Sequence, residues 1–314
     1  MEFSDWLNSD DSIGHYTSIE NAYEIIKSQK LRFSFLKSML DPSERVLSSR
    51  SFGEHSNSRE NVRRLHEHPE VLFPLEEELR KYNSSTQIAC FCQTKTHTEV
   101  FQGSIRPCFN NQRMWEQYGS AYLGACLIFS KKAILNSMRD KQVLFEAGSI
   151  IYKSNLHSRF EKLQISIDEY FESADIDKIT NNAKRRFDNI LLEKDIDYSS
   201  EKEFRIIVHS DEQQHIDTAN ALIGLAVFKE YDRSQIEQLI KMSMRLLGIE
   251  ESSELFSSYM NSYEERIKDR HVRLIHLAKT KDLGIIRLYS NEYGLRWYLP
   301  EEWKRLRDSL KSIN

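Results

Sequence analysis

Apolar and polar positions near the N-terminus predict a strand, a helix and a second strand. A short apolar stretch leads into His15, and Ser18 then suits the cap position of a helix. Apolar residues recur after that cap at helical spacing, at Ile19, Ala22, Tyr23, Ile25 and Ile26. Residues 31–35 alternate between apolar and polar, as a strand does. This opening places His15 at the junction between the first strand and the first helix.

Further apolar runs predict a sheet whose strands follow one another unevenly. Strands are expected at residues 86–92, 122–129, 149–152, 204–209, 222–228, 272–278 and 283–289. Helices are expected within residues 155–196, 233–247 and 252–269. Strands and helices do not alternate regularly, so the pattern favours an α+β fold with a mixed sheet over a doubly wound fold.

A polar stretch divides the first part of the chain. Residues 48–58 are rich in serine and predict an exposed loop, and residues 59–81 carry charged helix formers. We therefore predict a core over residues 1–212 with a helical insertion near 48–85, followed by an α+β extension over 213–314 that packs on the core. The histidines of the insertion have no strong apolar face around them, so we assign them no chemistry.

Composition and charge narrow the class of protein. The chain of 314 residues is 39% hydrophobic and 29% charged, which is typical of a globular protein. A formal charge of −4 gives no basic excess for a dedicated nucleic-acid module. There is no secretory signal and no run of about 18 apolar residues, so we expect a cytoplasmic protein that makes no use of a membrane.

The cysteines and the short motifs exclude several chemistries. Cys90 and Cys92 are separated by one residue, whereas zinc ligand pairs usually have gaps of two to four, so no metal site is expected. The chain contains no glycine-rich dinucleotide or phosphate loop, no Gly-x-Ser-x-Gly elbow and no His-Glu-x-x-His helix. Reduced cysteines on buried strands are the simplest interpretation.

Two short segments carry residues suited to chemistry, and each has a structural interpretation beside the functional one. His15 stands next to Tyr16 and Thr17, and a histidine at a strand end often only bonds backbone. Glu203 and Arg205 share one face of a predicted strand, so a structural ion pair is an equal contender. Aromatic residues dominate protein cores, which gives Trp115 and Tyr118 a packing role as the competing interpretation.

An ordered set of motifs resembles a bacterial family of unknown function, domain-of-unknown-function family twenty-nine seventy-one. The resemblance extends from about Ile13 to Val208. The motifs that carry it are His15-Tyr16-Thr17-Ser18, Leu31-Arg32-Phe33-Ser34, Asp41-Pro42-Ser43-Glu44, Met114-Trp115-Glu116-Gln117-Tyr118-Gly119 and Glu201-Lys202-Glu203-Phe204-Arg205. This family defines no activity by itself.

The opening of the chain is also similar to that of the ADP-ribosyltransferases, including their toxin-like members. Those enzymes place a His or Arg on the first strand, an aromatic residue or Ser on a middle strand and a Glu on a later strand. The similarity assigns His15 to the first place and Glu203 to the last, and leaves the middle place open between Tyr118 and Tyr122. It implies a mixed, mostly antiparallel split sheet with flanking helices.

That similarity implies NAD as the substrate. Cleavage of the nicotinamide–ribose bond develops positive charge, which the carboxylate of Glu203 would stabilise, while Glu201 would position the acceptor. Arg32 or Arg205 would hold the pyrophosphate through a forked contact. The residues expected to bind NAD are His15, Tyr16, Thr17, Arg32, Trp115, Tyr118, Tyr122 and Arg205. On this interpretation Glu203→Gln abolishes activity and leaves the fold intact.

The function expected from these residues is transfer of ADP-ribose from NAD to a macromolecule, either protein or nucleic acid. Such a glycosyltransferase would serve as a toxin or an anti-phage defence effector in a bacterium. The first alternative is a non-catalytic interaction protein of a defence system, whose C-terminal half from about Ala219 binds a protein partner. The second is a metal-independent RNase that uses His15, Arg32 and Glu203 as acid–base groups.

Overall fold

The fold is given by a computed structural model, which describes residues 9–39, 41, 44–45, 47, 54–67, 73–96, 105–154, 162–173, 175–228, 241, 254–291 and 294–299. The chain divides into two compact units, which are described one at a time. Unit 1 is formed by Met1–Leu31, Phe91–Ser137 and Asp217–Asn314, and unit 2 by Arg32–Cys90 and Met138–Ile216. The division into a core over 1–212 and an extension over 213–314 stays a prediction.

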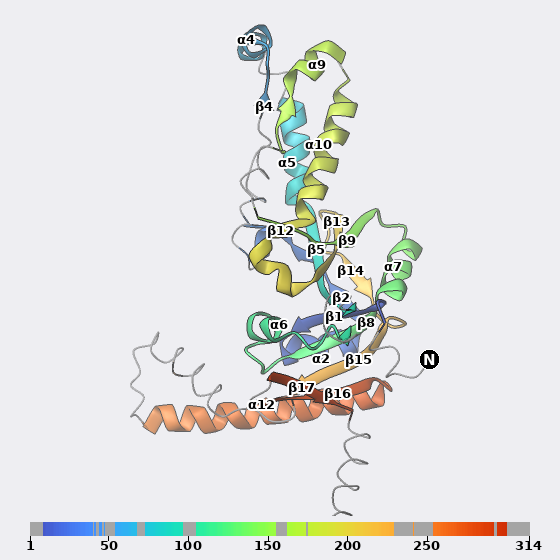
Figure 1. The fold of residues 1–314 in the computed structure, drawn as a ribbon, viewed down its shortest axis with the longest axis vertical. Coiled ribbons are helices and arrows are strands. Elements are labelled where there is room, and N and C mark those ends of the chain that lie inside the picture. The colour runs from blue at the N-terminus through green and yellow to red at the C-terminus, as the bar shows by residue number, and fades with distance from the viewer. Residues whose placement is uncertain are drawn as a thin grey trace, which may run out of the picture. The chain divides into compact units, whose positions relative to one another are not determined.

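The strands of unit 1 form a mixed and mostly antiparallel sheet (Figure 1). Their order is β17 (Gly294–Tyr298), β16 (Gly284–Asn291), β15 (Leu222–Phe228), β8 (Ala125–Ser130) and β1 (Ser12–Thr17), followed by the end of β5 (Thr86–Gln93). Only β15 and β16 run parallel among these pairs. In the register of β1, Gly14 lies opposite Ile128 of β8 and Cys92 of β5.

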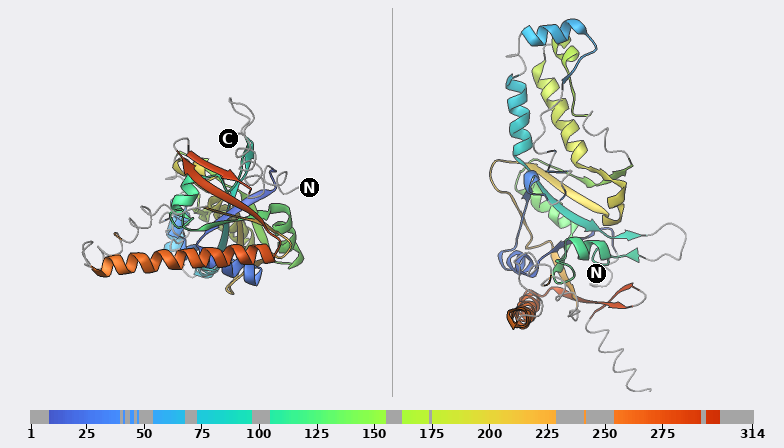
Figure 2. Two further views of the ribbon diagram at one scale, coloured as in Figure 1. Left: turned by 90° about the horizontal axis from the view of Figure 1, so that it is seen from below. Right: turned by 90° about the vertical axis from the view of Figure 1, so that its left-hand side faces the viewer.

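Two helices of unit 1 pack together beside this sheet. α2 (Ile19–Ser28) begins where predicted, since the Ser18 side chain accepts a hydrogen bond from the Asn21 N–H. α12 (Glu254–Thr280) contacts α2 and β16, and Figure 2 shows it as one long helix. Its buried residues Ile267, Leu274 and Ala278 lie on one face, so the strand expected at 272–278 is wrong.

A turn with unusual backbone geometry separates α6 (Gln112–Gln117) from β8. Ser120, Ala121 and Tyr122 have φ values of 49°, 50° and 70°, in the left-handed region that side chains disfavour. Backbone hydrogen bonds close the turn, including Tyr122 N–H to the Trp115 carbonyl at 3.1 Å and Gly124 N–H to the Gly119 carbonyl at 2.8 Å. The strand expected to begin at 122 therefore begins at 125.

Unit 2 combines short strands with a group of helices. Its strands are β3 (Ser34–Phe35), β4 (Glu54–His55), the start of β5, β9 (Phe145–Ser149), β10 (Ile151–Lys153), β11 (Ile165–Ser166), β12 (Glu193–Asp195) and β13 (Glu203–His209). β5, β13 and β9 are neighbours in that order, and β10 pairs in parallel with β12. The 3-10 helices are η1 (Leu36–Ser38) and η3 (Ile196–Glu201).

Four helices of unit 2 lie within the described residues: α4 (Arg59–Glu67), α5 (Phe73–Ser84), α9 (Ile167–Ser173) and α10 (Ile176–Leu191). α5 and α10 lie side by side in both views of the unit (Figures 1 and 2). Their apolar faces join the strands in one core that includes Leu79, Ile88, Phe187 and Ile207. This core supports the start of β13, where the polar residues of interest lie.

Three of the remaining elements lie at the borders of the units. α7 (Lys131–Asp140), β2 (Lys30–Arg32) and β14 (His215–Asp217) each cross a border, and β6 (Lys95–Thr96) pairs with β7 (Ile105–Arg106) in unit 1. The helix predicted for 233–247 falls outside the described residues apart from position 241. An α+β fold with a mixed, mostly antiparallel sheet and several helices is confirmed. None of the helices described is long and apolar enough to cross a membrane.

Candidate functional site

The Glu-x-Glu segment lies where η3 ends and β13 begins. Lys202, between the two glutamates, adopts a left-handed conformation with φ of 50° and ends the 3-10 helix. Glu203 is the first residue of β13, and its N–H donates a hydrogen bond to the Tyr152 hydroxyl at 2.9 Å. The side chains of Glu201 and Glu203 are 1% and 5% exposed, so both carboxylates lie inside unit 2.

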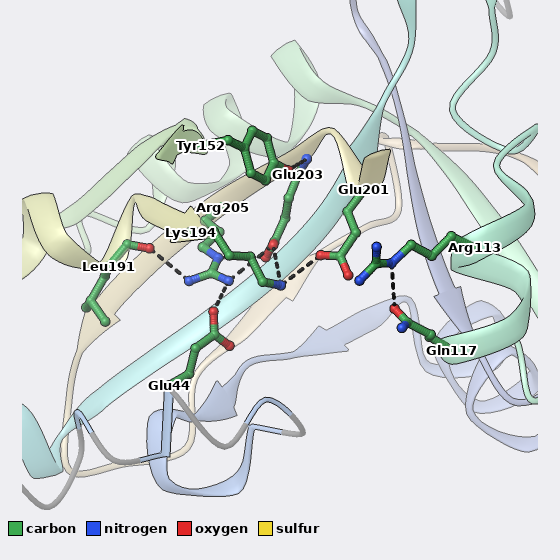
Figure 3. A network of polar contacts seen from close by, with 9 residues as sticks. All are labelled: Glu44, Arg113, Gln117, Tyr152, Leu191, Lys194, Glu201, Glu203 and Arg205. Carbon is green, nitrogen blue, oxygen red and sulfur yellow. Dashed lines mark hydrogen bonds and ion pairs between the residues drawn. The ribbon is translucent and has the colours of Figure 1, made fainter. Parts of the chain in front are cut away.

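Arg205 is the first of two cations that contact Glu203 (Figure 3). It is fully buried and points the same way as Glu203, because residues two apart share a strand face. Its Nε and Nη2 donate to the two oxygens of Glu203 at 2.6 and 3.1 Å, and its Nη1 donates to the Leu191 carbonyl at 2.8 Å. Nη2 also contacts the buried carboxylate of Glu44. The guanidinium is thereby fixed between two carboxylates and a backbone carbonyl.

Lys194 is the second cation that contacts Glu203. Its ammonium donates to Glu201 Oε2 at 2.7 Å and to Glu203 Oε2 at 3.2 Å (Figure 3). The same ammonium lies 4.6 Å from the ring centre of Tyr198, within reach of a cation–π interaction. The Lys194 side chain is 3% exposed. Both cations therefore face Glu203, and each also has a second carboxylate partner.

These charges determine how Glu203 ionises. Burial opposes the charged form, but Arg205 and then Lys194 outweigh it and lower the pKa of Glu203 to about 2. Burial would also lower the pKa of Arg205, yet Glu203 and Glu44 raise it well above its usual value. Burial and the charge of Glu203 raise the pKa of the neighbouring Cys90 thiol. At neutral pH the site holds an anionic Glu203 beside a protonated thiol.

In unit 1, His15, Tyr16 and Thr17 are the last three residues of β1. His15 is half-buried, and its ring centre is 5.9 Å from that of Phe91. Tyr16 is 6% exposed and its hydroxyl donates to the Cys108 carbonyl at 2.8 Å. Thr17 is buried as well. The phenol of Tyr16 thus has a structural partner within the core of the unit.

The predicted aromatic residues differ in how far they reach the surface. Trp115 is fully buried, donates from Nε1 to the Phe109 carbonyl at 2.8 Å, and packs edge-on against Tyr16 and Phe228. This geometry is the packing role described above as its competing interpretation. Tyr118 packs against the same cluster and is partly buried. Tyr122 is also partly buried against this cluster, and its hydroxyl donates to Glu116 Oε1 at 2.6 Å, so the middle place stays open between the two tyrosines.

The structure gathers only part of the predicted set into one network. Glu201, Glu203 and Arg205 share the buried cluster of unit 2, and Arg32 is an exposed residue at the end of β2. The residues predicted for the NAD site on β1 and around α6 all belong to unit 1: His15, Tyr16, Thr17, Trp115, Tyr118 and Tyr122. Joint action of His15 and Glu203 on one substrate stays a prediction.

Sequence reasoning missed four residues of the cluster. The sequence marks Glu44 only as the last residue of the motif Asp41-Pro42-Ser43-Glu44, yet its carboxylate contacts Arg205 across 161 positions of sequence. Lys194, Tyr152 and Tyr198 had no sequence signal, because nothing local distinguishes a buried lysine from an exposed one. Within the described residues, no group of three or more His, Cys, Asp or Glu side chains could hold a metal ion.

Comparison with known proteins supports one of the two resemblances. A family model described as Protein of unknown function (DUF2971) matches residues 114–206, less than a third of the chain. The matched segment begins in α6 and ends within β13, so it contains Lys194, Glu201, Glu203 and Arg205. No curated protein and no solved structure matches the chain. The relationship to ADP-ribosyltransferases stays a prediction.

Proposed function

We propose that the protein consumes NAD and transfers ADP-ribose to a protein or nucleic acid, on a scaffold of the ADP-ribosyltransferase type. The observation that supports this proposal best is the state of Glu203 at the start of β13. Its carboxylate is held ionised by Arg205 and Lys194, with a second glutamate two residues earlier. An anion held in this way is the group that a reaction with developing positive charge requires.

The chemistry follows from the bond that breaks. As nicotinamide leaves, the ribose gains oxocarbenium character, and a carboxylate beside it lowers the energy of that state. Glu203 takes this role and Glu201 orients the acceptor. The similarity to the ADP-ribosyltransferases assigns NAD binding to His15, Tyr16 and Thr17, and the aromatic contact to Tyr118 or Tyr122. Arg205 keeps Glu203 ionised and oriented, which is a positioning role rather than the pyrophosphate contact expected from the sequence, because its described donors already bind Glu203, Glu44 and Leu191.

Burial sets a condition on this proposal. The Glu203 side chain is 5% exposed, and both of its oxygens face cations. A substrate can reach the carboxylate only if one of those cations gives way. The proposal therefore requires a rearrangement at the start of β13 before chemistry occurs.

The test is release of nicotinamide from NAD by the purified protein, with cell extract as a source of acceptors. Glu203→Gln is compared with Glu44→Gln, which also removes one buried carboxylate from Arg205 but none from the Glu-x-Glu segment. We expect Glu203→Gln to lose roughly a hundredfold in rate and Glu44→Gln to lose far less. Circular dichroism confirms that each variant is folded at the assay temperature. Equal losses in the two variants, or no release by the natural protein, would contradict the proposal.

The burial of the cluster favours a second candidate, a non-catalytic interaction protein. Glu201 and Glu203 are both satisfied by Lys194 and Arg205 inside unit 2, as expected for charges that only hold a fold together. On this alternative, the protein releases no nicotinamide with any extract, and Glu203→Gln changes stability alone. The same assay therefore separates the two candidates.

A further inference from the structure

The ammonium of Lys194 lies in surroundings that suit a cation from outside the chain. It is enclosed by the carboxylates of Glu201 and Glu203, at 2.7 and 3.2 Å, and by the ring of Tyr198, at 4.6 Å from the ring centre. Two anions and an aromatic face are the groups that bind organic cations. Tyr198 is half-buried, whereas the other three residues are buried. The aromatic residue is thus the member of this cage nearest to solvent.

The substrate of the proposed reaction carries such a cation. The nicotinamide ring of NAD is a pyridinium, and the positive charge moves toward the ribose as the bond breaks. Resting on the proposed function, we propose that Lys194 is an internal cation that occupies the place of the substrate's positive charge and closes the site at rest. Glu203 Oε2 accepts from both Lys194 and Arg205 Nη2, and withdrawal of the lysine frees one of its two acceptor positions.

The differences between the two cations indicate which of them moves. Arg205 binds both oxygens of Glu203, Glu44 and the Leu191 carbonyl, so its withdrawal would break contacts in four places. Lys194 has one donor group on a flexible stem, and it lies on β12, a strand of three residues that pairs only with β10 among the described strands. When Lys194 leaves, Arg205 still keeps Glu203 charged.

The first test uses the natural protein and measures the accessibility of Lys194. Lysines are reductively methylated with formaldehyde and a borane, and the modified peptides are quantified by mass spectrometry. At rest, Lys194 should react about tenfold or more slowly than Lys153, whose side chain is 39% exposed. Addition of 1-methylnicotinamide, a pyridinium cation, should accelerate methylation of Lys194 and leave Lys153 unchanged. No acceleration at millimolar 1-methylnicotinamide would overturn the inference.

The second test empties the cage. Lys194→Ala leaves two buried carboxylates without their shared cation, and small organic cations should then raise the melting temperature of this variant. Lys162→Ala is the matched control. Lys162 pairs with Glu193, the neighbour of Lys194 on β12, and contacts neither Glu201 nor Glu203. We expect stabilisation of Lys194→Ala by 1-methylnicotinamide but not by neutral nicotinamide, and none of Lys162→Ala. Equal responses of the two variants would overturn the inference. Should Lys194→Ala fail to fold, the labelling of the natural protein is the deciding test.

Neither test depends on turnover, so the two proposals can fail separately. If 1-methylnicotinamide displaces Lys194 and no nicotinamide is ever released from NAD, the cation site stands and the transferase proposal falls. If nicotinamide is released and Lys194 remains unreactive throughout, the transferase proposal stands and the internal cation falls.

Discussion

Glu203→Gln gives the sharpest test of the buried cluster, because its effect on stability can be worked out in advance. The pKa of this carboxyl falls from 4.5 to about 2 on folding. At 1.36 kcal/mol for each pH unit, the charged carboxylate stabilises the folded state by about 3 kcal/mol at neutral pH. Loss of one partner from a buried ion pair costs about 3–5 kcal/mol in other proteins. The lower figure applies here, because two carboxylates and two cations remain in balance after the substitution.

The pH dependence of this effect has a definite sign. The folded pKa is the lower one, so the stabilisation is complete above pH 4.5 and is lost as pH falls toward 2. The difference between the natural protein and Glu203→Gln should therefore shrink by more than about 1 kcal/mol between pH 7 and pH 3.5. A structural effect of the amide group alone would not change with pH in this way.

The assay is urea unfolding followed by far-ultraviolet circular dichroism at several pH values. Tryptophan fluorescence is unsuitable, since the four tryptophans at 6, 115, 297 and 303 all lie outside the segments of unit 2. Glu78→Gln serves as the control. Glu78 pairs with Lys184 on the surface of the same unit, so this substitution should lower the free energy of unfolding by less than about 1 kcal/mol. A loss below about 1 kcal/mol at pH 7 for Glu203→Gln, or a loss that is constant down to pH 3.5, would refute the reasoning.

Three further predictions concern other parts of the structure. Arg205→Lys keeps the charge but not the forked contact with Glu203, so urea unfolding should show a loss of about 1–3 kcal/mol, and no loss would contradict the geometry. Ala121→Gly removes the cost of a left-handed conformation, about 1–2 kcal/mol, but raises the conformational entropy lost on folding by about 0.5–1 kcal/mol. The melting temperature should therefore rise slightly or stay level, and a clear fall would contradict this reasoning. Gly14→Ala would bring a methyl group to 2.7 Å from Cys126 Sγ, and thermal unfolding should show a loss of about 1–3 kcal/mol, which an unchanged melting temperature would disprove.

The elements that could be predicted are those with local causes. Ser18 bonds the first turn of α2, and this contact lies within four residues of sequence. β5, β13 and β15 are apolar runs that follow the predicted positions closely. Each of these assignments needed only neighbouring residues, which the sequence displays directly.

The failures arose where another part of the chain determines the outcome. Residues 272–278 are an apolar run with only two polar residues, which suits a buried strand as well as a helix. Val272 is nevertheless 66% exposed and Leu274 is buried, because α12 continues through them. The region expected as a single strand at 149–152 is divided between β9 and β10. Packing against α2 and β16, which no short window contains, decides the first of these cases.

The candidate site shows the same limit. The Glu203–Arg205 pair could be predicted as a competing interpretation, since a spacing of two places both side chains on one strand face. Glu44 and Lys194 could not, because their role comes only from charges brought together by folding. The sequence suggests that the Glu203 carboxylate is available to a substrate, whereas in the structure it is buried and already bound by two cations.

The order of strands has a practical meaning for the segment that the family model matches. Residues 114–206 include β8 but neither of its partners, β1 and β15. They include the start of β13 without β5, and Arg205 without Glu44. A fragment cut at these positions would expose both edges of β8 and one edge of β13, and would leave Arg205 without Glu44. We therefore expect it to aggregate when expressed alone. The partners that complete β8 and neutralise Arg205 thus include residues on both sides of the matched region, and only Glu203 among them lies within the family match itself.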